Sequence, residues 1–322
     1  MFVRKRTNRF APEPGNTIKL ETAGVHHVTA VAGDPRRNVD FYTETLGLRL
    51  VKRTVNFDDP GTYHLYYGDR TGTPGTILTF FPFENGTQGT PGRGQQTATA
   101  FVVPDNSFDY WTERFDAHDV AYDEPEVRFG ARVLAFRDPD GQPLELVTGE
   151  SDVAPWDGSD VPAEYGIRGF HGVTLSSRRP DETARVLDLL GYEEVAAEGD
   201  RTRFAAAGDR AEYVDLLDTD GPSGTPGAGT VHHVAVRAAD GDEQEAWREF
   251  LSDAGLNVTA VKDRQYFTSI YFREPGGILF EIATDGPGFD RDESVDSLGS
   301  ALKLPPWLED RRSELEARLP SL

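Results

Sequence analysis

The chain of 322 residues contains no cysteine, which excludes disulfide bonds, cysteine-ligated zinc sites and thiol nucleophiles. It also has no apolar run that approaches the roughly 20 residues of a membrane span. The polar residues 1–19 lack the apolar segment of a secretory signal peptide. We therefore expect a cytoplasmic protein with no membrane partner and with an N-terminal extension over residues 1–20.

Lysine is scarce, and acidic residues far outnumber basic ones. The formal net charge is −22, and all but five of the 33 basic residues are arginine. This charge excludes nucleic acid as a partner, because nucleic acid is itself negative. An acidic, lysine-poor surface is typical of proteins that stay soluble in high salt, so we expect a halophilic, haloarchaeal host. An ordinary acidic protein from a mesophile is the alternative.

One motif with two adjacent histidines occurs near both ends of the chain. Gly-Val-His-His-Val-Thr spans residues 24–29, and Thr-Val-His-His-Val-Ala spans residues 230–235. Glu281 follows in the apolar run 278–283. Two histidines and one carboxylate on strand-like runs are the ligand set of a facial-triad iron site.

A pattern of one strand, one helix and three strands recurs four times, giving an α+β fold of four βαβββ modules. In the first module, Asp34-Pro35 predicts a helix start and Gly47 its end. A segment rich in proline and glycine separates the modules into two consecutive pairs. The predicted units are an N-terminal extension (1–20), a first domain of two modules (21–150) and a linker (151–168). A second domain of two modules (169–290) and a C-terminal helical tail (291–322) follow.

Alignment of the four modules shows which of them kept metal ligands. The second residue of the His-His pair corresponds to His27, Thr97, Gly172 and His233 in chain order. The polar residue of the last strand corresponds to Thr79, Glu145, Asp215 and Glu281. Only the first and fourth modules carry histidine, so the predicted ligands are His27, His233 and Glu281, and Glu145 is assigned a structural role. Because neighbouring strand residues face opposite ways, His26 is not expected to share a face with His27.

These motifs, with Asn-Val-Asp-Phe-Tyr at residues 38–42 and Tyr-Phe-Arg-Glu-Pro-Gly-Gly at residues 271–277, resemble the vicinal oxygen chelate superfamily. The similarity is greatest to its hydroquinone-type ring-cleaving dioxygenases. The resemblance implies two domains of curved mixed sheets around a cavity, with Fe(II), or Mn(II), on the three ligands. It also implies catalytic roles near the substrate for four residues: His26, His232, Tyr271 and Arg264.

The resulting hypothesis is a non-haem Fe(II) dioxygenase that inserts both atoms of O₂ into hydroquinone- or catechol-type aromatic diols. His64 and Tyr66 alternate on a predicted strand and are expected to line the same cavity. Two other functions stay open: a metal-dependent lyase or isomerase of the glyoxalase type, for which Zn(II) or Ni(II) would be suited, and a non-catalytic small-molecule-binding protein. A homodimer is the default oligomer.

Overall fold

The computed structural model describes residues 20–322, so the expected N-terminal extension lies outside the described residues except for Leu20. The first module starts its helix as predicted, since Asp34 accepts a hydrogen bond from the backbone N–H of Arg37 at 2.9 Å. The helix then changes into a π-helical turn before Gly47. This module consists of β1 (Val25–Ala32), α1 (Pro35–Asp40), η1 (Phe41–Thr45), β2 (Arg49–Asn56), β3 (Asp59–Gly68) and β4 (Ile77–Pro82).

The other three modules repeat the order of one strand, one helix and three strands. The second comprises β5 (Gln95–Val103), α2 (Phe108–Ala117), β6 (Glu126–Arg128), β7 (Ala131–Arg137) and β8 (Pro143–Thr148). The third comprises β9 (Phe170–Ser176), α3 (Pro180–Leu189), β10 (Glu193–Glu198), β11 (Arg201–Ala205) and β12 (Tyr213–Leu217). The fourth comprises β13 (Thr230–Ala238), α4 (Gly241–Asp253), β14 (Lys262–Asp263), β15 (Phe267–Arg273) and β16 (Leu279–Pro287).

Two eight-stranded mixed sheets confirm the predicted fold class. Their strand orders are β14-β15-β16-β13-β1-β4-β3-β2 and β10-β11-β12-β9-β5-β8-β7-β6. The first sheet thus joins the first and fourth modules, and the second joins the second and third, through antiparallel pairs β1–β13 and β5–β9. The linker at residues 151–168 had suggested that each sheet would be built from two consecutive modules. The observed sheets instead combine modules that are not consecutive. The domain boundaries along the chain stay a prediction.

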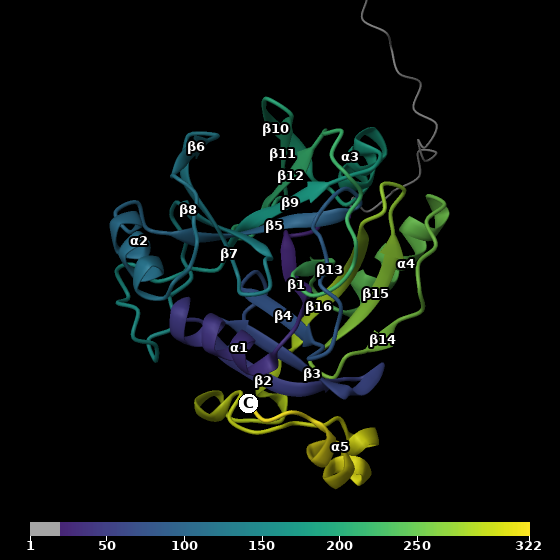
Figure 1. Cartoon of the computed structure of the whole chain (residues 1–322). Coiled ribbons are helices and arrows are strands. Elements are labelled where there is room, and N and C mark those ends of the chain that lie inside the picture. The colour runs from purple at the N-terminus through teal and green to yellow at the C-terminus, as the bar shows by residue number, and fades with distance from the viewer. Residues whose placement is uncertain (1–19) are drawn as a thin grey trace, which may run out of the picture.

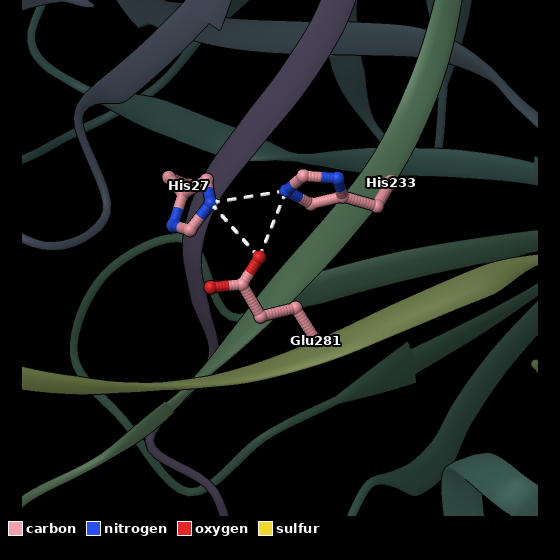
Figure 2. Close-up of side chains that lie close together, drawn as sticks. All are labelled: His27, His233 and Glu281. Atoms are coloured by element: carbon pink, nitrogen blue, oxygen red, sulfur yellow. Dashed lines mark hydrogen bonds and ion pairs between the residues drawn. The ribbon is translucent and has the colours of Figure 1, made fainter. Parts of the chain in front are cut away.

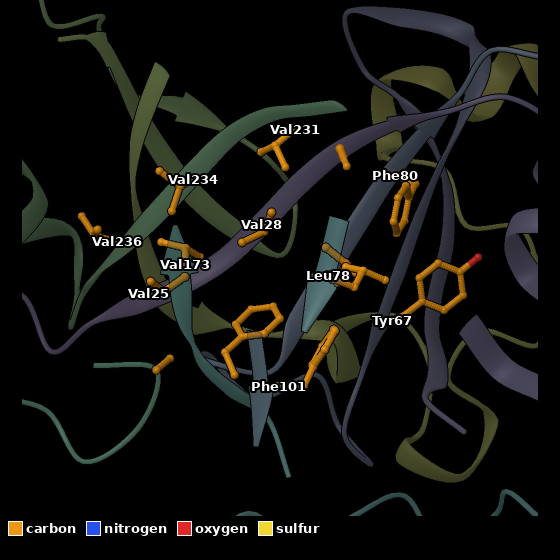
Figure 3. Packing of buried hydrophobic residues seen from close by; sticks show 14 of the residues in the cluster. Val25, Val28, Tyr67, Leu78, Phe80, Phe101, Val173, Val231, Val234 and Val236 are labelled. Atoms are coloured by element: carbon orange, nitrogen blue, oxygen red, sulfur yellow. The ribbon is translucent and has the colours of Figure 1, made fainter. Parts of the chain in front are cut away.

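The two sheets pack against each other through one face each (Figure 1). Val28 and Val234 from the first sheet share a continuous buried cluster with Phe101 and Val173 from the second (Figure 3). Side chains alternate along a strand, so residues next to these valines face the opposite side of the first sheet. That side of the sheet carries the functional residues.

The C-terminal segment packs against the first module. It contains less α-helix than expected and lies beside β2 and β3 (Figure 1), where the Tyr63 hydroxyl donates to the carbonyl of Pro320 at 3.0 Å. None of the helices within residues 20–322 combines the length and apolar character needed to cross a membrane. The segment consists of η2 (Phe289–Arg291), η3 (Val295–Ser297), η4 (Pro306–Arg311) and α5 (Arg312–Arg318).

Candidate metal centre and its cavity

The three predicted ligands converge from three strands of the first sheet (Figure 2). Nε2 of His233 lies 2.9 Å from Oε2 of Glu281. Nε2 of His27 lies 3.5 Å from the same oxygen and 3.3 Å from Nε2 of His233. All three side chains are buried, and among the described residues they form the group of histidine and acidic side chains that could hold a metal ion. The structure brings the predicted set together, while metal binding itself stays a prediction.

Strand register explains why residues so far apart in sequence meet. Thr29 on β1 pairs with His233 on β13, and Ala235 on β13 pairs with Glu281 on β16. His27 lies two residues from Thr29, and His233 lies two residues from Ala235, so alternation places all three ligands on one face of the sheet. The contact between the first and fourth modules therefore creates the site.

The surroundings of Glu281 fit a bound cation. Its Oε1 accepts a hydrogen bond from Ser269 Oγ at 2.5 Å, whereas Oε2 is buried and has no aligned hydrogen-bond donor among the described residues. Burial alone would raise the pKa of Glu281, but His27 and His233 outweigh burial and hold that pKa well below its ordinary value. A buried, ionised oxygen beside two imidazole nitrogens matches the ligand preference of Fe(II) or Mn(II).

Hydrogen bonds determine which nitrogen of His27 is free for a metal. His26 Nε2 lies 3.2 Å from the carbonyl of Thr284, which can only accept, so this nitrogen carries the proton. Burial keeps the pKa of His26 well below its usual value, so the ring is neutral and its Nδ1 is an acceptor. His27 Nδ1, at 2.9 Å from that atom, must then donate, which leaves a lone pair on His27 Nε2.

The two residues that precede the ligand histidines have different positions. His232 Nδ1 lies 2.8 Å from His233 Nδ1, which repeats the His26–His27 contact, and His232 also lines the cavity over the triad. His26 is packed behind His27 against Phe267 and is not among the cavity-lining residues. His26 thus faces away from the cavity, as expected for a neighbour of His27 on a strand, whereas His232 lines the cavity together with His233.

A cavity of about 220 Å³ lies over the triad. Its wall includes the predicted residues Arg264 and Tyr271, and Arg264 Nε donates to the Tyr271 hydroxyl at 3.1 Å. Burial raises the pKa of Tyr271 far above its usual value, so its hydroxyl keeps its proton. The same guanidinium contacts Asp58 at 3.0 Å, at the rim of the cavity. Four phenylalanines supply apolar wall: Phe57, Phe81, Phe83 and Phe267.

His64 and Tyr66 line the cavity, as their alternation predicted. The Tyr66 hydroxyl lies 2.8 Å from His64 Nδ1, and His64 Nε2 lies 2.8 Å from Thr79 Oγ1. Burial lowers the pKa of His64 well below its usual value, so the ring is neutral at physiological pH. A polar chain thus runs from the cavity wall to the last strand of the first module.

Sequence reasoning missed two polar residues of the site. Ser269 fixes one oxygen of Glu281, and Asp58 holds Arg264. Ser269 could have been found, because it lies two residues before Tyr271 on a predicted strand and so shares its face. No signal in the sequence indicated Asp58, which comes from a hairpin turn in another module.

The second sheet has an equivalent but altered site, and its register corrects one alignment. Asp215 pairs with Thr174 and Glu145 with Ala100, as Glu281 does with Ala235. His233 lies two residues before Ala235, so the equivalent positions in the second sheet are Gly172, two residues before Thr174, and Ala98, two residues before Ala100. The assignment of Thr97 was wrong by one residue, since the pairing of β5 with β8 places Ala98 at the position of His27.

Arginines neutralise both carboxylates of this second site. Arg203 Nε donates to Asp215 Oδ1 at 2.7 Å, and Arg128 Nη1 donates to Glu145 Oε1 at 2.9 Å. These buried carboxylates already have guanidinium partners, and among the described residues His171 is the one histidine that lines their pocket, so the ligand set differs from that of the first site. The geometry agrees with a structural role for Glu145.

Fold and site together define a class of enzyme in which βαβββ modules curve around two histidines and a carboxylate. Comparison with known families agrees: residues 24–146 and 172–282 match the Glyoxalase/Bleomycin resistance protein/Dioxygenase superfamily. The chain belongs to this superfamily.

Relatives match over nearly the whole chain. A Bacillus subtilis protein with the provisional name ring-cleaving dioxygenase MhqO is 48% identical over 93% of this chain and 96% of its own length. The chlorohydroquinone/hydroquinone 1,2-dioxygenase of Sphingobium indicum is 38% identical over 91% of this chain and 94% of its own length.

Solved structures show the same architecture. A Bacillus subtilis crystal structure with a provisional dioxygenase title has a TM-score of 0.92 and 47% identity, covering 94% of this chain and 98% of that one. Glyoxalase I from Zea mays, with a TM-score of 0.59 and 16% identity over 81% of this chain and 92% of that one, shares the fold. The chain is an enzyme, and the relatives that match most of its length are named dioxygenases.

Proposed function

We propose that this protein is an Fe(II)-dependent dioxygenase that cleaves the ring of hydroquinone- or catechol-type diols. The convergence of His27, His233 and Glu281 beneath a cavity walled by phenylalanine carries this proposal. Bound ferrous iron would supply the redox chemistry that allows O₂ to react with an electron-rich ring. The names of the relatives support an aromatic diol as the substrate.

The apolar walls select a flat, uncharged ring. Phe81 and Phe267 exclude water from the space above the triad and offer ring faces for stacking. A small aromatic diol buries its carbon skeleton there and keeps its two hydroxyls for polar partners. Stacking fixes the plane of the ring, so that its edge faces the ligand triad.

Tyr271 and Arg264 act together on one oxygen of the substrate. Since the Tyr271 oxygen already accepts from Arg264 Nε, the tyrosine proton is free to donate to a substrate oxygen. The guanidinium strengthens this donor by withdrawing charge from the phenol oxygen. The pair therefore stabilises negative charge that develops on the substrate oxygen.

His232 and His64 are the neutral imidazoles of the cavity wall. Burial lowers the pKa of His232 to about 4 and that of His64 well below its usual value, so both rings are neutral at pH 7. Both nitrogens of His64 already contact Tyr66 and Thr79. Nδ1 of His232 accepts from the ligand His233, so His232 Nε2 carries the ring proton. We assign a donor role to His232 first, because its Nδ1 is occupied by the ligand His233 and its Nε2–H can hydrogen-bond a substrate oxygen.

Oxygen uptake tests the proposal directly. Protein purified and loaded with Fe(II) without air is supplied with hydroquinones and catechols, and O₂ consumption is recorded with an electrode. We expect one O₂ per ring-opened product. We also expect His233→Ala and Glu281→Gln to reduce both bound iron and uptake by more than about 100-fold, since even indirect contacts to a metal contribute 10- to 100-fold.

Glu145→Gln is the matched control for Glu281→Gln. Glu145 occupies the carboxylate position of the second sheet, so this variant should keep both bound iron and O₂ uptake. No uptake across the panel, with iron shown to be bound, would contradict the proposal.

A further inference from the structure

A second cavity of about 280 Å³ adjoins the first one, behind the strand that carries His232 and His233. Val31, His232 and His233 line both cavities. A molecule formed at the ligand triad therefore has a second space directly beside it.

The second cavity is positively charged, although the protein as a whole carries a net charge of −22. Arg178 and Arg273 line it, and neither guanidinium has an ion pair with a carboxylate in the described part of the chain. Two unpaired arginines in one cavity leave donor groups that suit a carboxylate ligand.

The backbone of two glycines leaves room for the guanidinium of Arg178. A Cβ atom at Gly94 would lie 2.6 Å from Arg178 Cζ, and one at Gly277 would lie 2.7 Å from Arg178 Nη1. Both residues have positive φ, so glycine is required for their backbone as well as for the space that the guanidinium occupies. Arg273 contacts the same loop, since its Nη1 donates to the carbonyl of Gly277 at 2.5 Å.

Gln96 supplies a polar group of the opposite kind. It lines the same cavity and is 2% exposed, and its Nε2 donates to Thr99 Oγ1 at 2.8 Å. Its Oε1 is buried and has no hydrogen-bond partner among residues 20–322. A ligand hydroxyl would satisfy this acceptor. The cavity thus combines donors for a carboxylate with an acceptor for a hydroxyl.

We propose that this second cavity binds the ring-opened product, with Arg178 and Arg273 holding its carboxylate and Gln96 its remaining hydroxyl. The inference rests on the proposed function. Cleavage of the bond between a hydroxyl-bearing carbon and its neighbour, with both atoms of O₂ retained, converts a 1,4-diol into an acid and an aldehyde. The acid loses its proton to water, whereas the second hydroxyl remains. The product is therefore negatively charged, whereas the substrate is uncharged.

Binding of cis,cis-muconate, a stable six-carbon dicarboxylate, tests the site by isothermal titration calorimetry on the Fe(II)-loaded protein without air. In the double variant Arg178→Gln with Arg273→Gln, we expect the dissociation constant for muconate to rise about tenfold or more. The dissociation constant for phenol, an uncharged ring, should not change. Arg179→Gln is the matched control, because Arg179 is exposed and pairs with Glu182 outside the cavity.

Unchanged muconate affinity in the double variant would overturn the inference, as would an equal loss in Arg179→Gln. The calorimetric result does not depend on turnover, so it is separate from the test of the proposed function. If muconate binding depends on the two arginines but no O₂ is consumed, the cavity is a carboxylate site whose ligand is not the ring-opened product. Normal O₂ uptake, together with muconate binding that does not depend on the two arginines, would overturn only the product site in the second cavity.

Discussion

At the scale of single residues, the site depends on how each ligand is oriented by its neighbour. His26 links the carbonyl of Thr284 to Nδ1 of His27, and this contact leaves the Nε2 lone pair of His27 directed at the triad. Contacts of this kind behind a ligand fix both the ring orientation and the tautomer. The structure thus favours a positioning role for His26, whereas His232 lies in the cavity where the substrate would bind.

Replacement of His26 tests this positioning role. We expect His26→Phe to weaken Fe(II) binding by about 10- to 100-fold, because His27 loses its hydrogen-bond acceptor. Competition with a chromophoric chelator measures the affinity, and circular dichroism confirms that the variant folds. His118→Phe, at an exposed position, is the control and should bind iron normally. Equal iron affinity in both variants would contradict the role.

At the scale of elements, a buried ion-pair network fastens the C-terminal segment to β2. Lys52 is fully buried, and its Nζ lies 2.6 Å from Asp292 Oδ1 and 2.5 Å from Glu293 Oε2. The Tyr266 hydroxyl also donates to Asp292 at 3.0 Å. Phe289, at the start of the same segment, packs against Tyr66 in the cavity wall. The segment therefore supports the site from outside the sheet.

Lys52→Met should destabilise the protein by about 3–5 kcal/mol, because it leaves the buried Glu293 and the partly buried Asp292 without a cation. Urea unfolding followed by fluorescence measures the change in free energy of unfolding. Adding Glu293→Gln to Lys52→Met should recover part of the loss, since it removes one of the unpaired charges. If Lys52→Met alone were as stable as the natural chain, the network would not fasten the segment.

Helix starts and strand faces were predictable, whereas register was not. The Asp34-Pro35 start and the shared face of His64 and Tyr66 follow from local chemistry and from the two-residue period of a strand. The assignment of Thr97 failed because β5 has no histidine to mark the position, so that only its pairing with β8 fixes the alignment. Asp58 was missed because its contact with Arg264 joins two distant hairpins.

At the scale of the whole molecule, the net charge of −22 makes stability dependent on salt. Repulsion among acidic side chains opposes the compact state, and salt screens this repulsion. We expect the midpoint of thermal unfolding to rise by about 5 °C or more between 0.1 and 2 M KCl, equivalent to roughly 3 kcal/mol for a chain of this length. Differential scanning calorimetry measures the midpoint. An equal rise with an uncharged osmolyte such as sucrose would show that screening is not the cause.

The sequence by itself determined the repeated module, the charge of the surface and the identity of the three candidate ligands. Each of these depends on composition, on the period of side chains along a strand, or on comparison of one module with another. The tertiary structure decided that the first module pairs with the fourth, and that a second, arginine-lined cavity adjoins the triad. Both depend on contacts between segments far apart in the chain, and local sequence patterns do not specify such contacts.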